Sequence, residues 1–262
     1  MSKNAISRRD ILKYGAAISA AAATVGFPGI FGLGLARAAD DDAATILNIA
    51  ATAETFATTH YYRALEELDF SEGEKKYMLA AMESEFIHLS FLNANGGKAL
   101  TEEFYFPQGT FADKKMLGTV TAVAETVFVA AYLAATRRFA ELGSPLLSMV
   151  ASQVAVVEGQ HLLFMRGLAG NSPANNLALG DPLFYNVSDA VPVISGLLDG
   201  KSQVAGIDTE TSAYKYPGAD AVKKMLGGAS FCLEAPKTSL IRRDVPEDVQ
   251  FFRQAPDIAM VE

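Results

Sequence analysis

Two glutamate–histidine pairs place the strongest constraint on how this chain can fold. In the first pair, Glu85 precedes His88 by three positions. In the second, Glu158 precedes His161 by the same spacing, although the chain has only three histidines. Both pairs lie in apolar stretches with helical periodicity, where residues three apart share one face of a helix. Each stretch therefore predicts a helix with a carboxylate and an imidazole on its buried face.

A single glutamate precedes each pair in another apolar stretch. Glu54 lies 31 residues before the glutamate of the first pair (85 − 54), and Glu125 lies 33 residues before that of the second (158 − 125). A tyrosine, Tyr61 or Tyr132, follows each single glutamate after seven residues, or about two helical turns. The pattern predicts two related halves, each with one Glu helix and one Glu-x-x-His helix.

Cap and turn residues delimit these helices. We expect four helices, beginning near residues 43, 71, 113 and 144 and ending near residues 68, 96, 143 and 167. The second opens with a capping box, Ser71 to Glu74. Short links within each half predict two antiparallel hairpins. The longer link, residues 97–112, contains Phe104-Tyr105-Phe106-Pro107 and predicts a crossover packed over one end of the bundle.

The composition changes after the fourth helix. Residues 171–262 contain more prolines and glycines and shorter apolar runs. We expect an irregular, partly helical C-terminal extension, with short helices near residues 193–198, 220–226 and 246–254. Its expected role is to cover the bundle or to form a partner surface.

The glutamates and histidines of this pattern resemble the ligand set of the ferritin-like superfamily of dimetal carboxylate proteins. The resemblance implies an all-α fold in which residues 39–170 form a ferritin-like four-helix bundle, with two hairpins joined by a long crossover. It also implies a site for two metal ions. The implied ligands are Glu54, Glu85, His88, Glu125, Glu158 and His161.

The resemblance also assigns roles within this set. Glu85 and Glu158 would bridge the two ions, each histidine would bind one ion, and the single glutamates would be terminal ligands. Tyr61 and Tyr132 would lie beside the ligands, where a phenol can donate a hydrogen bond to a carboxylate or supply an electron. An ordinary core position is the alternative for each tyrosine.

Several short segments are similar to an exported ferritin-like group related to desiccation-associated proteins of plants and bacteria. These are Ile46-Leu47-Asn48 before Glu54, residues 104–107, Ala124-Glu125-Thr126 followed by Tyr132, and the second Glu-x-x-His pair. The similarity covers roughly residues 43–170. It implies a dimetal site more firmly than it implies a particular reaction.

The first 38 residues have the pattern of a twin-arginine export signal. Ser7-Arg8-Arg9 and Lys13 precede an apolar run over residues 14–35, and Ala36-Arg37-Ala38 fits a cleavage site. We therefore expect a periplasmic or extracellular protein, with an uncleaved membrane anchor as the alternative. Because this route carries folded proteins, metal can be bound before export, which suits iron or manganese.

Charge and cysteine content exclude several partners and bonds. Without residues 1–38 the chain keeps 17 basic residues (22 − 5) and 29 acidic residues (30 − 1), a net charge of −12. Such a surface repels nucleic acid and anionic lipid, so we expect no nucleic-acid partner and no stable membrane anchor after cleavage. Cys232 is the only cysteine, so no internal disulfide can form.

Other polar residues near the pattern are expected to have ordinary roles. His60 is six residues after Glu54 and points about 120° away around the helix, which predicts a surface histidine or one with a satisfied hydrogen bond. Glu66 and Glu67 are rivals of Glu54 as ligands, but they lie in the last turn and are expected to be solvated. Glu83 points off the ligand face and is also expected to be solvated.

The sequence supports two main functional hypotheses. In the first, two iron ions, or alternatively two manganese ions, react with O₂ or peroxide, as in ferrous oxidation or peroxide detoxification under stress. In the second, the protein is structural or protects against stress and desiccation, and the metal only holds the bundle together. A metal-free helical interaction module is a third reading, and a homo-oligomer is open in each case. In a metal-free site, four crowded carboxylates should all have raised pKa values.

Overall fold

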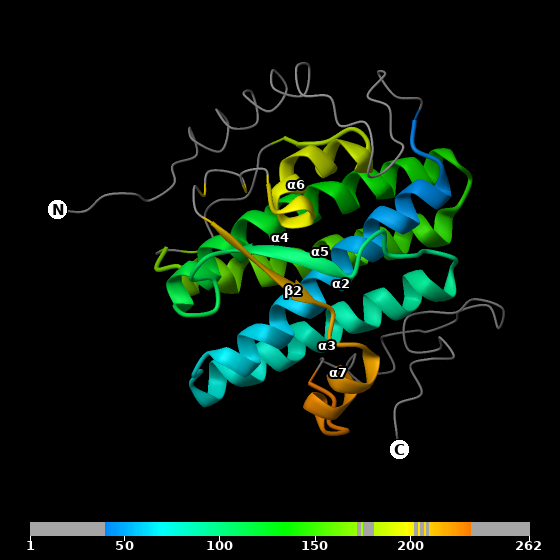
Figure 1. Cartoon of the computed structure of the whole chain (residues 1–262). Helices are drawn as coiled ribbons and strands as arrows, with labels where there is room; N and C mark the ends of the chain where they lie inside the picture. The colour runs from blue at the N-terminus through cyan, green and yellow to red at the C-terminus, as the bar shows by residue number, and fades with distance from the viewer. Residues whose placement is uncertain are drawn as a thin grey trace.

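Four long helices form the main body of the structure, a computed structural model that describes residues 40–171, 174, 181–201, 204, 207 and 210–231. The helices are α2 (Ala43–Glu67), α3 (Glu72–Ala94), α4 (Lys114–Glu141) and α5 (Pro145–Leu168). They pack as two hairpins, α2 with α3 and α4 with α5 (Figure 1). The predicted helical bundle of two hairpins is therefore confirmed.

Caps explain where these helices begin. Asp42 accepts a hydrogen bond from a first-turn amide of α2 at 2.7 Å, and Asp113 does the same for α4 at 3.0 Å. Ser71 and Glu74 form the predicted capping box of α3. The fourth helix starts with Pro145, whose ring fixes a helical φ and whose missing N–H needs no partner.

Two apolar clusters fill the bundle, and the polar residues of the Glu and His pattern lie between them. On α2, Ala51 belongs to one cluster and Phe56 to the other, with Glu54 between them. On α5, Ala155 and Met165 bracket the second Glu-x-x-His pair in the same way. The apolar faces on both sides of this layer hold the helices together, since burial of such side chains is the main stabilising contribution.

The crossover carries a strand, which the all-α expectation missed. Strand β1 (Glu103–Pro107) pairs in antiparallel register with β2 (Thr211–Lys215) of the C-terminal extension. Phe104 and Phe106 are buried, and their rings lie 5.6 and 5.0 Å from the ring of Phe56 in the middle of α2. The ribbon therefore lies along the flank of the bundle, not over its end as expected (Figure 1).

Two of the three short helices expected in the C-terminal extension are present. They are α6 (Val191–Asp199), which follows the short helix η1 (Val187–Ala190), and α7 (Ala219–Leu226). The helix α6 contacts β1 and α4, and α7 contacts α3, so the extension covers two sides of the bundle. The third helix expected at residues 246–254, Cys232 and the export signal expected at residues 1–38 all lie outside the described residues.

Among the helices that the structure describes, α4 and α5 are long and apolar enough to cross a membrane by length and composition. These two helices pack along each other in the bundle. They approach closely at Gly118, where a Cβ would lie 2.6 Å from both the Ala169 amide nitrogen and the Met165 carbonyl oxygen. No side chain fits at this position without displacing backbone.

We predict that Gly118→Ala destabilises the protein by about 1 to 3 kcal/mol, because the added methyl group forces α4 and α5 apart. Gly159→Ala is the matched control, since a Cβ there meets no atom within 4 Å. Alanine favours a helix over glycine by about 1 kcal/mol, so the control should be neutral or stabilising. Urea unfolding followed by circular dichroism measures both. Equal midpoints for Gly118→Ala and the wild type would contradict this packing.

Candidate metal centre

Each helix of the bundle contributes to one buried polar layer. The helices α2 and α4 each supply a glutamate, and α3 and α5 each supply a Glu-x-x-His pair. These residues are Glu54 (α2), Glu85 and His88 (α3), Glu125 (α4), and Glu158 and His161 (α5). The solvent-exposed fraction of each is at most 4%. The structure thus brings together all six residues that the sequence pattern singled out.

The six residues fall into two overlapping groups. In each group, one nitrogen or oxygen per residue lies within 4.8 Å of those of the others. One group contains Glu54 and His88, and the other contains Glu125 and His161. Glu85 and Glu158 belong to both. This sharing is the arrangement that bridging carboxylates require, with the single glutamates and the histidines at the two ends.

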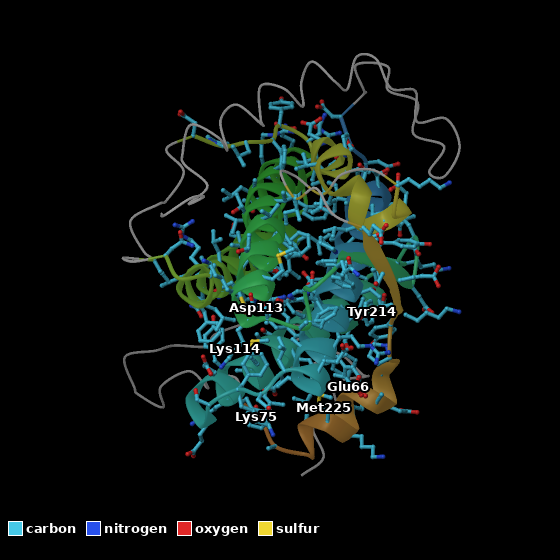
Figure 2. All side chains as sticks on the ribbon, turned by 60° about the vertical axis from the view of Figure 1, so that its left-hand side comes forward. Glu66, Lys75, Asp113, Lys114, Tyr214 and Met225 are labelled. Carbon is cyan, nitrogen blue, oxygen red and sulfur yellow. The ribbon has the colours of Figure 1, made fainter. Side chains whose placement is uncertain are left out.

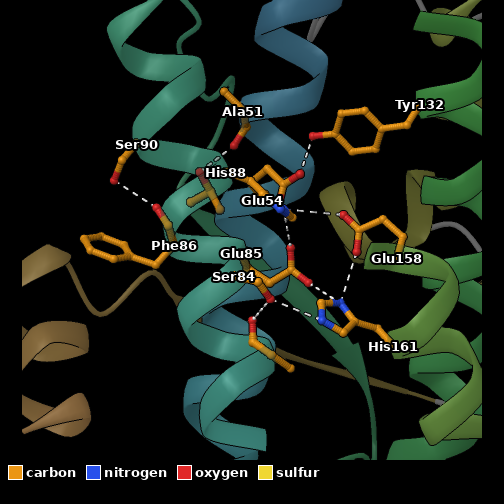
Figure 3. Close-up of polar contacts among 12 residues, drawn as sticks. Ala51, Glu54, Ser84, Glu85, Phe86, His88, Ser90, Tyr132, Glu158 and His161 are labelled. Atoms are coloured by element: carbon orange, nitrogen blue, oxygen red, sulfur yellow. Dashed lines mark hydrogen bonds and ion pairs between the residues drawn. The ribbon is translucent and has the colours of Figure 1, made fainter. Parts of the chain in front are cut away.

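Both imidazoles turn Nδ1 towards the carboxylates (Figure 3). The Nδ1 atom of His161 lies 2.7 Å from Glu85 Oε1 and 3.1 Å from Glu158 Oε2. The Nδ1 atom of His88 lies 3.3 Å from Glu85 Oε2, 3.5 Å from Glu54 Oε2 and 3.8 Å from Glu158 Oε1. Glu85 therefore lies between the two imidazoles and contacts each with one oxygen.

The two tyrosines connect the halves of the bundle reciprocally. The hydroxyl of Tyr61 donates a hydrogen bond to Glu125 Oε1 at 2.7 Å, and the hydroxyl of Tyr132 donates one to Glu54 Oε1. Each tyrosine thus orients the single glutamate of the other half. Burial, followed by the charge of the bonded glutamate, raises the pKa of both phenols well above the ordinary value. Both phenols therefore remain protonated donors.

Burial and mutual repulsion shift the pKa values of the acids. Burial raises the pKa of Glu54 and of Glu158 to about 8, and the charge of Glu85 adds to both shifts. Burial and Glu158 together raise the pKa of Glu125 well above its usual range. Burial acts in the same direction on Glu85, but the adjacent His161 reverses the effect and lowers its pKa. We expected all four carboxylates to have raised pKa values, and this expectation is wrong for Glu85.

The pKa values of His88 and His161 are raised, although burial alone would lower them. Burial disfavours their charged forms, but the carboxylates outweigh it. The pKa of His88 rises to about 10, mainly through Glu54, and that of His161 rises well above its ordinary value, mainly through Glu85. In the absence of metal at neutral pH, one carboxylate is therefore ionised between two imidazolium groups.

The hydrogen bonds of this layer leave positions that metal ions fit. Five carboxylate oxygens accept no hydrogen bond from any residue that the structure describes. They are Glu54 Oε2, both oxygens of Glu85, Glu125 Oε2 and Glu158 Oε1. The two oxygens of Glu85 face the Nδ1 atoms of His161 and His88 as ion pairs. Clustered carboxylate oxygens with imidazole nitrogens are a donor set for divalent transition-metal ions.

Sequence reasoning missed Ser84. Its hydroxyl donates to the Ala81 carbonyl at 2.8 Å, so it accepts from Nε2 of His161 at 3.2 Å. This bond fixes the ring so that Nδ1 faces the carboxylates, as partners of metal-binding histidines do. Ser84 and His161 are 77 residues apart, and neither segment alone carries a signal of their contact.

The third histidine is buried outside the layer. His60 is 1% exposed, and its Nε2 lies 2.6 Å from the Thr121 hydroxyl, which donates to the Leu117 carbonyl at 2.8 Å. Nε2 is therefore the donor, which satisfies one ring nitrogen as expected. Burial lowers the pKa of His60 to about 3, so this ring is neutral. The other expectation for His60, a position on the surface, is wrong.

The other acids considered as ligands lie away from the layer. Glu66, which is labelled in Figure 2, and Glu67 are exposed at the end of α2. Glu66 pairs with Arg63. The expectation of a solvated Glu83 is wrong, because Glu83 is 3% exposed. Its carboxylate accepts hydrogen bonds from the hydroxyl of Ser230 at 2.9 Å and from the amide of Phe231 at 2.6 Å. Glu83 therefore holds the C-terminal extension against α3.

The fold and this layer define a class of protein, a helical bundle whose core carries clustered carboxylates and imidazoles. The family model that describes a ferritin-like domain matches residues 42–171. The bundle therefore belongs to the ferritin-like superfamily, as the sequence pattern indicated. Neither a curated protein nor a solved structure matched the chain.

We predict that the metal-free protein loses stability as pH rises from 7 to 9. The folded pKa values of Glu54, Glu158 and His88 exceed their unfolded values, so the folded state holds protons that the unfolded state has released. Each such proton contributes a fall of order 1 kcal/mol per pH unit. Urea unfolding at several pH values, with chelator present, measures the slope. Glu158→Gln should make this slope smaller. A wild-type unfolding free energy that stays constant or rises with pH would contradict the raised pKa values.

Proposed function

We propose that the layer binds two divalent ions, iron or alternatively manganese, and that the protein uses them for oxidative chemistry with O₂ or peroxide. The reaction would be ferrous oxidation or peroxide detoxification under stress. The observation that carries the proposal is the pair of overlapping buried groups that share Glu85 and Glu158. Two separate single-ion sites would not need shared carboxylates.

The proposed roles follow from this sharing. Glu85 and Glu158 would be shared by the two ions, Glu54 and His88 would help to hold one ion, and Glu125 and His161 would help to hold the other. Four carboxylates carry −4 and two divalent ions carry +4, so the filled layer is neutral. Because most of these groups hold protons when no metal is bound, binding releases protons and should tighten as pH rises.

The residues around the layer prepare it for this chemistry. When bound, iron or manganese would supply the electrons and the Lewis acidity needed to reduce O₂ or peroxide. Tyr61 and Tyr132 keep the terminal carboxylates in place and retain their own protons. The apolar clusters on both sides exclude water from the layer.

The cellular setting belongs to the same proposal and is supported by sequence alone. Residues 1–38 would direct export by the twin-arginine route, and the protein would function in the periplasm or outside the cell. It would be a member of the desiccation-related exported group. Loading before export would let the cell choose the ion, since raw affinity favours copper or zinc over iron or manganese.

A structural role for the metal is the second candidate function. One observation favours it, namely that the six side chains come from all four helices, so bound ions would cross-link the whole bundle. A structural or stress-protective protein needs only this cross-link. Binding alone therefore does not separate the two candidates, whereas turnover does.

We predict that the natively produced protein holds two ions per chain and that chelation lowers its melting temperature. Ions at 100 times their dissociation constant add about 2.7 kcal/mol per site, or roughly 5 to 10 °C. His161→Gln should lose about one ion, and Glu158→Gln should weaken both. His60→Gln, a buried histidine outside the layer, is the matched control and should keep two. Metal analysis and calorimetry decide; equal ion content in all three variants would refute the assignment.

We predict multiple turnovers when the metal-loaded protein meets excess Fe²⁺ with O₂, or excess peroxide with a reductant. The rate should fall at least 100-fold in Glu158→Gln and remain near the wild-type value in His60→Gln. An oxygen electrode and a peroxide assay measure the two reactions. A protein that is stabilised by two ions but shows no turnover would have the structural role instead.

A further inference from the structure

A small apolar cavity borders one end of the candidate centre. His88 and Tyr132 line it, together with apolar residues of all four helices, including Ala50, Val150 and Val154. The centre of a water-sized sphere can occupy about 20 Å³ of it, which is room for one water molecule or one diatomic molecule. Nearly all of its wall is carbon.

The cavity lies between the polar layer and the end of the bundle where α2 and α5 begin. Ala50 precedes Glu54 by four residues, about 6 Å along α2, and Val154 precedes Glu158 by the same spacing on α5. Because His88 contacts Glu54 and Tyr132 donates a hydrogen bond to it, the cavity adjoins the Glu54 group of the centre.

The other end of the centre has different surroundings. His161 packs against the rings of Tyr61 and Tyr77, with ring centres 5.6 and 6.3 Å away, and its Nε2 bonds to Ser84. None of these residues lines the cavity. The carbon-lined cavity thus adjoins the His88 end, and the residues that surround His161 do not line it.

The apolar lining of the cavity determines which kind of small molecule can bind in it. A buried water needs two to four polar partners, which this wall does not supply, so the space stays dry. Peroxide would lose its hydrogen bonds on entering, whereas an apolar diatomic molecule loses none. We propose that the cavity binds a small apolar molecule of the O₂ class and holds it beside His88. In naming O₂ over peroxide as the molecule admitted here, the inference rests on the proposed function.

Xenon is the probe for binding, and it needs no metal. In wild-type protein under xenon pressure, the methyl NMR signals of Val150 and Val154 should shift, with and without metal. Ala151, on α5, also lines the cavity. Ala151→Leu should fill the cavity and abolish these shifts, and Ala50→Val is a second filling variant in case the first does not fold. Absence of xenon shifts at both valines in the wild type would overturn the proposal.

A second apolar cavity of the same size provides the control. It is lined by Ala53, Ile194 and Leu197 among others, and by none of the six candidate ligands. Ala53→Leu should remove xenon shifts at Ile194 and Leu197 and leave those at Val150 and Val154. Loss of all shifts in this control would show a global disturbance and would overturn the local assignment.

The metal-loaded protein tests access. Ala151→Leu should slow the reaction with O₂ at least fivefold while metal content and the reaction with peroxide stay unchanged, and Ala53→Leu should change neither. An unchanged O₂ rate in a variant that excludes xenon would overturn delivery through this cavity. Xenon shifts in a wild-type protein that never consumes O₂ would reject the oxidative function and support the apolar binding site alone.

Discussion

Four carboxylates share one buried layer, and the rest of the structure depends on how their charge is compensated. Ionised acids at this depth would be strongly destabilising without partners. The metal-free layer avoids that cost by keeping protons on three acids, while Glu85 stays ionised between two imidazoles. Divalent ions bound here would compensate the same charge in another way, so protons and metal would compete for one set of atoms.

The repeat in the sequence explains why the layer is built symmetrically. Each half supplies a glutamate, a tyrosine two turns later and a Glu-x-x-His pair, and each tyrosine bonds to the glutamate of the opposite half. Neither half can therefore orient its own terminal carboxylate. The exchange links the two hairpins by polar contacts inside an otherwise apolar core, where alternatives without partners are costly.

Helix caps and helical spacing in the sequence predicted the bundle and the polar layer, whereas contacts between residues far apart in the sequence could not be predicted. Caps and glycines place helix ends within about two residues, and helical spacing alone puts Glu85 and His88 on one face. The strand β1 was missed because its partner β2 is more than 100 residues away and neither strand is long. Glu83 and Ser84 were missed for the same reason, since their partners lie 147 and 77 residues distant.

The symmetry of the repeat ends at the layer itself. The His161 end is surrounded by hydroxyl groups and aromatic rings, whereas the His88 end meets a carbon-lined space. The surface of that space offers almost no hydrogen-bond partners, so a polar molecule would lose hydrogen bonds on entering it, whereas an apolar molecule would lose none. Two positions with equivalent ligand sets can therefore differ in what reaches them. Ligand count alone does not determine the chemistry of such a centre, because the packing beyond the ligands decides which molecule arrives.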